Sequence, residues 1–118
     1  MQAQGGHIMK MVLERYHGLG NDYLVFDPNK NELELNPKNV SMLCNRNMGL
    51  GSDGILEGPI LGEKHMAVRI WNPDGSIAQK SGNGVRIFAK YLKDAGYGTK
   101  KKYELLTDGG EVEITYRQ

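Results

Sequence analysis

The segment best suited to chemistry is Ser81-Gly82-Asn83-Gly84, which stands immediately before a predicted helix. The first N–H groups of a helix have no partners within the helix, and the helix dipole adds partial positive charge there. Glycines at this point let an anion approach the backbone, so the segment fits a carboxylate or a phosphate. The alternative is that these glycines only form a tight turn. The segment lacks the spacing and the Lys of a phosphate-binding P-loop, which argues against nucleotide binding.

Two further glycine-containing corners carry polar side chains, Gly20-Asn21-Asp22 and Trp71-Asn72-Pro73-Asp74-Gly75. An Asn side chain offers both a donor and an acceptor, so Asn21 and Asn72 could together read an ammonium and a carboxylate. Taken separately, each corner is more typical of a turn than of a ligand site. No group of His, Cys, Asp and Glu has metal-ligand spacing, so we expect no metal site, and we expect His17 and His65 to be structural or on the surface.

Apolar runs bounded by turn residues predict a set of short strands that position these corners. Residues 76–79 are expected to pair back as a hairpin arm after the turn at 72–75. These strands predict an α+β domain, in which a curled, mostly antiparallel sheet surrounds one long central helix. The predicted strands are 12–16, 23–26, 55–60, 66–71, 103–106 and 111–116.

Two helices are expected. Asn36-Pro37 is a capped helix start, and that helix continues to about residue 46, with Cys44 as a small buried hydrophobe. The long helix is predicted to begin after Gly84 and to end at Gly96, a natural left-handed cap. Its apolar residues recur at helical spacing, and two more widen the stripe, so we expect it to be enclosed on more than one side. They are Val85, Ile87, Phe88, Ala89, Tyr91 and Leu92.

The composition fits one globular domain of 118 residues. A net charge of +1 gives no basic field for nucleic acid, and no apolar run approaches the roughly 20 residues that span a bilayer. The single cysteine excludes an internal disulfide and suits a cytoplasmic location. We expect residues 1–10 to be a tag or a disordered N-terminus, and residues 11–118 to form the domain.

In combination, four motifs closely resemble the N-terminal half of diaminopimelate epimerases, and the match runs from about Tyr16 to Lys93. The resemblance implies two similar halves, each a curled sheet around a central helix, with the active site in the cleft between them. It also implies that the second, C-terminal domain is absent here. The motifs, in order, are His17-Gly-Leu-Gly-Asn-Asp22, Gly49-Leu-Gly-Ser-Asp-Gly54, Asn72-Pro-Asp-Gly-Ser76 and Gly82-Asn-Gly-Val-Arg86.

The resemblance implies an epimerase that needs no cofactor and acts on a free amino acid, with diaminopimelate the leading substrate and lysine or peptidoglycan precursor synthesis the leading pathway. In the family, two cysteines on opposite faces of Cα exchange the α-proton, one as thiolate and one as thiol. The second of these comes from the C-terminal half. By the same matching, Asn21 and Asn72 fall on substrate-binding asparagines, and Gly82 and Asn83 on the backbone pocket for the α-carboxylate.

Two positions depart from the family pattern. Ser81 stands where the first catalytic cysteine is expected, either as an engineered change or as a natural serine-bearing branch. A serine hydroxyl is a far weaker acid than a thiol and needs a neighbouring base. Gly54 stands where some relatives place a polar substrate contact. Because the resemblance implies that the second half is absent, we expect the chain alone to be inactive and, with apolar surface and strand edges left exposed, to form homo-oligomers. Two alternatives stay open: an isomerase or racemase for another amino acid, and a catalytically dead amino-acid-binding domain.

Overall fold

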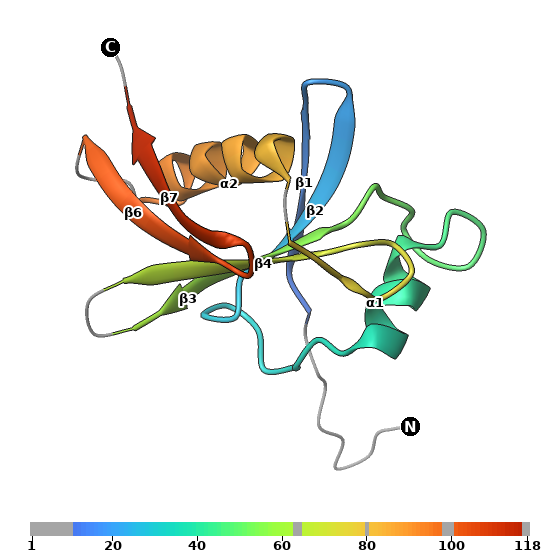
Figure 1. The fold of residues 1–118 in the computed structure, drawn as a ribbon. Helices are drawn as coiled ribbons and strands as arrows, with labels where there is room; N and C mark the ends of the chain where they lie inside the picture. Colours follow the sequence, from blue (N-terminus) through green and yellow to red (C-terminus); the bar gives the residue numbers. More distant parts are fainter. Residues whose placement is uncertain (1–10, 63–64, 80, 98–100, 117–118) are drawn as a thin grey trace.

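The computed structural model describes residues 11–62, 65–79, 81–97 and 101–116, so the prediction for residues 1–10 concerns residues outside these ranges. Within them the chain forms one curved sheet and two helices (Figure 1). The elements are β1 (Leu13–Gly18), β2 (Asn21–Phe26), α1 (Pro37–Cys44), β3 (Ile55–Leu61), β4 (Met66–Trp71), β5 (Ile77–Ala78), α2 (Gly82–Asp94), β6 (Lys102–Thr107) and β7 (Gly110–Thr115).

The sheet is mixed. Its order is β1-β2-β3-β4-β6-β7, and the short β5 pairs with β4. Four of the pairings are antiparallel, whereas β2–β3 and β4–β6 are parallel. Parallel neighbours need a crossover connection, and here α1 lies between β2 and β3, and α2 between β4 and β6. The predicted α+β class is confirmed, with the two crossovers adding parallel pairs to a mainly antiparallel sheet.

The long helix α2 lies in the concave side of the sheet, between the β1–β2 hairpin and the β6–β7 hairpin (Figure 1). Its most buried side chains are Ile87, Phe88, Tyr91 and Leu92, which belong to a core cluster with residues of every long strand, including Tyr16 of β1, whose ring packs edge-on against Tyr91. Val85 and Ala89, which also belong to the predicted stripe, are only half-buried. The buried stripe is therefore rotated toward Ile87 and Tyr91, because the curled sheet encloses that side of the helix.

The opposite face of the sheet packs against α1. Successive residues of a strand point to opposite faces, and β2 follows this rule. Tyr23 and Val25 belong to the cluster around α2, whereas Leu24 and Phe26 belong to a second cluster. Cys44 is 3% exposed in that second cluster, which confirms the prediction of a small buried hydrophobe.

A buried carboxylate anchors the end of α2. Asp27, at the end of β2, accepts hydrogen bonds from the hydroxyls of Tyr91 at 2.6 Å and Tyr97 at 2.9 Å. Burial and the bond to Asp27 raise the pKa of Tyr91. The helix then ends as predicted, with Gly96 in the left-handed conformation at φ 86°. Neither of the helices that the structure describes is long and apolar enough to cross a membrane.

Candidate functional site

The start of α2 differs from the prediction by three residues. Ser81 is the N-cap and Gly82 is already helical, whereas the sequence predicted a start after Gly84. The Ser81 hydroxyl oxygen accepts a hydrogen bond from the Gly84 N–H at 3.0 Å. The N–H groups of Gly82 and Asn83 lie in the first turn, where no helical carbonyl precedes them, and the described part of the chain supplies no other acceptor. Two backbone donors are thus left for an anion.

Close packing explains why the helix can begin on glycines. A Cβ atom at Gly84 would lie 2.8 Å from the Ser81 hydroxyl and 3.3 Å from side-chain carbons of Ile70 and Leu56. Only glycine lets this turn pack directly on β3 and β4. A Cβ atom at Gly82 would meet nothing within 4 Å, so the backbone there faces open space.

The structure brings Asn21 to the start of α2. Asn21 opens β2 after the turn at Leu19-Gly20, and its side-chain oxygen accepts from the Asn83 amide nitrogen at 2.7 Å. The same amide nitrogen lies 3.4 Å from the Leu19 carbonyl oxygen. Two of the predicted site residues, 62 positions apart in the chain, are therefore in direct contact.

Among the described residues, Asn72 has no hydrogen bond to the other predicted site residues. It lies just after β4, and its side-chain amide donates to the Ser76 hydroxyl at 2.9 Å. Its backbone also closes this turn, because the Asn72 N–H donates to the Ser76 carbonyl and the Gly75 N–H to the Asn72 carbonyl. Asn72 acts in the structure as a turn residue, and its role toward a substrate stays a prediction.

Tyr23 was missed by the sequence analysis, which treated residues 23–26 only as a buried strand. Its hydroxyl lies 3.1 Å from the Ser81 hydroxyl, and the side chain is buried. The signal was present: Asn21 and Tyr23 are two positions apart on one strand, so they share a face, and that face meets α2. Ser81 thus has a hydroxyl neighbour and a backbone donor, but the described residues place no carboxylate or imidazole against it.

A second missed residue is Asp53, in the loop before β3. Its carboxylate accepts from the Asp22 N–H at 2.8 Å, from the Asn21 amide at 3.4 Å, and from Arg46 at 2.9 Å. The hydrogen bond from the Asp22 backbone, followed by Asn21 and Arg46, holds the pKa of Asp53 below its usual range. A charged carboxylate therefore stands directly behind Asn21.

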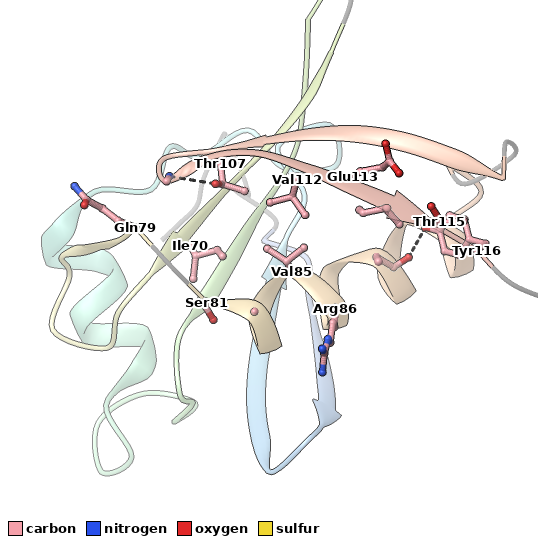
Figure 2. A pocket seen from close by; sticks show the side chains of 14 residues that line it. Ile70, Gln79, Ser81, Val85, Arg86, Thr107, Val112, Glu113, Thr115 and Tyr116 are labelled. Carbon is pink, nitrogen blue, oxygen red and sulfur yellow. Dashed lines mark hydrogen bonds between the residues drawn. The ribbon is translucent and has the colours of Figure 1, made fainter.

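A groove of about 530 Å³ runs from the start of α2 along the helix, beneath the β6–β7 hairpin (Figure 2). Ser81 and Arg86 lie on its helix side, and Val85 points toward Val112 on the hairpin. Apolar side chains line its middle, whereas the Ser81 end is polar. Ser81 and Gly82 thus line one end of a largely apolar groove, whereas Asn83 is not among its lining residues.

None of the remaining candidate residues is placed for catalysis or metal binding in the described part of the chain. Burial raises the pKa of the Cys44 thiol, and the Ser52 hydroxyl oxygen lies 3.3 Å from its sulfur. His17 is exposed, with its ring nitrogen 3.6 Å from Asp22. Over residues 11–62, 65–79, 81–97 and 101–116, no group of three His, Cys, Asp or Glu could hold a metal ion. The site can therefore bind an anion and orient amides, with no strong base beside Ser81.

Known proteins resemble this chain over most of its length. The sequence profile described as diaminopimelate epimerase matches residues 14–118. The chain is 51% identical over 104 residues to diaminopimelate epimerase 2 of Nostoc sp., covering 87% of this chain and 36% of that protein. It is 36% identical over 109 residues to the diaminopimelate epimerase of Synechococcus elongatus, covering 91% of this chain and 39% of that protein. It thus spans well under half the length of these curated relatives.

Among solved structures, the fold is similar to a crystal structure of the phenazine biosynthesis protein PhzF family from Enterococcus faecalis. The TM-score is 0.64, and the match covers 92% of this chain and 40% of that chain. The sequence identity is 12%, so this likeness concerns the fold alone.

Proposed function

Because the chain belongs to the diaminopimelate epimerase family, we propose that it is one lobe of an amino-acid epimerase and binds the substrate's α-carboxylate at the start of α2. The observation that carries the proposal is the pair of N–H groups on Gly82 and Asn83, which have no acceptor among the described residues and lie at the positive end of a 13-residue helix. Open space at Gly82 lets a carboxylate reach them. Asn21, bonded to Asn83, adds an amide at the edge of the same turn.

The proposed reaction is the interconversion of LL- and meso-diaminopimelate by proton transfer at Cα, in lysine or peptidoglycan precursor synthesis, without a cofactor. Inversion needs one group to remove the α-proton and another to deliver a proton to the opposite face. Ser81 stands at the position for one face, and the described residues offer no second acid or base near it. The complete reaction therefore requires a second lobe, and the 118-residue chain alone is inactive.

One observation favours a second candidate function, amino-acid binding without catalysis. The Ser81 oxygen accepts from the Gly84 N–H, and its other hydrogen-bond partner among the described residues is the Tyr23 hydroxyl, so it serves as a helix cap. A hydroxyl in that setting has no base to take its proton. On this alternative the same turn holds the carboxylate, and no proton moves.

Titration of the ¹⁵N-labelled chain with meso-diaminopimelate, followed by NMR, tests the carboxylate site. We expect the backbone amide signals of Gly82 and Asn83 to shift first, with weak affinity that salt lowers, since an exposed helix dipole contributes about 0.3–1 kcal/mol. The control is 1,5-diaminopentane, which lacks both carboxylates and should leave these signals in place. Shifts that spare Gly82 and Asn83 at saturation would overturn the site.

Incubation of the chain with LL-diaminopimelate in heavy water tests the catalytic part. The proposal predicts neither deuterium at Cα nor the meso isomer. Stereoinversion by the 118-residue chain would show that Ser81 and its neighbours suffice, and would remove the need for a second lobe.

A further inference from the structure

The Gly49–Gly54 loop is a sequence motif to which the carboxylate site gives no role. Its backbone is fixed at several points. The Asp53 N–H donates to the Asp22 carbonyl at 2.7 Å, and the buried Ser52 hydroxyl donates to the Gly54 carbonyl at 2.9 Å. Gly51 is left-handed at φ 73°. The loop thus holds the Asp53 side chain at a defined place behind β2.

From this placement, and resting on the proposed function, we infer that Asp53 is a positioning residue that fixes which way round the Asn21 and Asn83 amides lie. An ionised carboxylate only accepts hydrogen bonds. The Asn21 side chain must therefore turn its NH₂ toward Asp53, where the distance is 3.4 Å. The reversed amide would place two acceptor oxygens against each other.

The orientation passes from Asn21 to α2. With its NH₂ toward Asp53, Asn21 presents its side-chain oxygen to the helix. Asn83 therefore donates to this oxygen from its own side-chain NH₂, with 2.7 Å between the nitrogen and the oxygen. The second hydrogen of that NH₂ faces the Leu19 carbonyl oxygen at 3.4 Å. The Asn83 side-chain oxygen is then the atom that has no partner among the described residues.

With the amides in this orientation, the start of α2 presents both hydrogen-bond donors and a hydrogen-bond acceptor. The backbone N–H groups of Gly82 and Asn83 donate, and the Asn83 side-chain oxygen accepts. A free amino acid carries a carboxylate and an ammonium on the same carbon, and so it needs one donor group and one acceptor. With the opposite polarity, Asn83 would offer a further donor and would repel the ammonium. Asp53 thus selects for an amino acid over a plain carboxylic acid.

The Asp53 carboxylate stays charged at neutral pH, so it fixes the amide orientation there. The Asp22 N–H, Asn21 and Arg46 hold its pKa low, so the polarity persists at neutral pH and is lost only as the pH falls through that lowered pKa. The other charged groups facing this corner are Arg15, paired with Asp22 at 2.7 Å, and the nearby His17. A titration must therefore follow the Asp53 carboxyl carbon itself.

The ligand-free test is NMR of the side-chain amides in the chain labelled with ¹³C and ¹⁵N. We expect the Asn21 NH₂ signals to move together with the Asp53 carboxyl carbon as acid is added. Asp53→Ala should shift the Asn21 and Asn83 NH₂ signals, whereas Asp53→Asn should largely restore them, because its oxygen can still accept from Asn21. Asp108→Ala is the matched control, since Asp108 pairs with Arg69 and is 32% exposed against 34% for Asp53.

Binding supplies the second readout, with meso-diaminopimelate and pimelate, which lacks both amino groups, as probes. Because one hydrogen bond is lost, Asp53→Ala should bind meso-diaminopimelate about 2- to 12-fold more weakly than wild type and should bind pimelate with unchanged affinity. The inference would be overturned if Asp53→Ala weakened the binding of both probes equally, or if the Asn21 NH₂ signals did not change with the ionisation or removal of the Asp53 carboxyl. If Asp53→Ala does not fold, the wild-type acid titration decides. If neither probe binds, the proposed carboxylate site fails, and the ligand-free spectra still decide the role of Asp53.

Discussion

Replacing Ser81 by cysteine tests the electrostatics of the α2 start without needing a substrate. The Ser81 oxygen lies 3.0 Å from the Gly84 N–H, with the free N–H groups of Gly82 and Asn83 in the same turn. A thiolate at that position would be stabilised by these donors and by the helix dipole. We therefore expect the new thiol to have a lower pKa than an ordinary cysteine.

The structure sets the size of both effects. A dipole contribution of about 0.3–1 kcal/mol raises the ratio of thiolate to thiol about 2- to 5-fold at a given pH. Removal of a serine N-cap costs about 0.5–2 kcal/mol, and the neutral thiol, a weak acceptor, recovers little of it. For a chain of this size, each kcal/mol lowers the melting temperature by about 4 °C. The variant should thus be more reactive and less heat-stable than wild type.

The assay is the rate of alkylation by iodoacetamide as a function of pH. Cys44 is an internal blank, because it is buried and burial raises its pKa. The matched control is Lys90→Cys, which places an exposed thiol in the middle of the same helix. If Ser81→Cys reacts with the same pH dependence as Lys90→Cys, the α2 start has no useful positive potential and the carboxylate site loses its physical basis.

Three other outcomes follow from the geometry. Gly82→Val should fold normally, since a Cβ there meets nothing within 4 Å, but should abolish the diaminopimelate-dependent amide shifts; persistence of those shifts would refute the backbone site. Asp27→Ala should lose about 1–3 kcal/mol in urea unfolding, because the hydroxyls of Tyr91 and Tyr97 lose their buried acceptor, whereas Asp27→Asn should lose less. The chain should form dimers or larger species, with exposed apolar side chains such as Met48 as contacts, and a monomer by light scattering up to millimolar concentration would contradict this.

Sequence patterns predicted the helices and strands well where neighbouring residues along the chain determine them. The second helix was predicted from its apolar spacing, and Gly96 ends it as expected. Its start was misplaced because glycine costs about 1 kcal/mol in a helix interior, which argued for a loop at 82–84. The Ser81 cap and the packing of Gly84 on Ile70 and Leu56 outweigh that cost. Neither contribution is visible from propensity alone.

The contacts that build the site could not be predicted in the same way. Asn21 meets Asp53 across 32 residues, Ser81 meets Tyr23 across 58, and Asn83 meets Asn21 across 62. The first depends on the parallel β2–β3 pairing, and the other two depend on how the start of α2 packs against β2; a single sequence leaves both open. The motifs predicted that these corners form a site, but only the fold shows which of them are in contact. Asn72, equally prominent in the sequence, is bonded within its own turn.

On the proposed function, Ser81 occupies a position where stability and catalysis favour different side chains. An N-cap should be a good acceptor, and serine is among the best, whereas a proton-transferring group must ionise readily, which favours cysteine. With serine, the Gly84 N–H is satisfied and the turn that presents Gly82 and Asn83 is firmly held. On the proposed function, serine at this position also lacks the thiol that would be best able to take a proton from Cα. A chain with serine here should therefore bind its amino acid at least as tightly as a cysteine variant. Comparing the affinities of wild type and Ser81→Cys for meso-diaminopimelate tests this expectation. Tighter binding by the cysteine variant at neutral pH would show that the cap contributes nothing to the site.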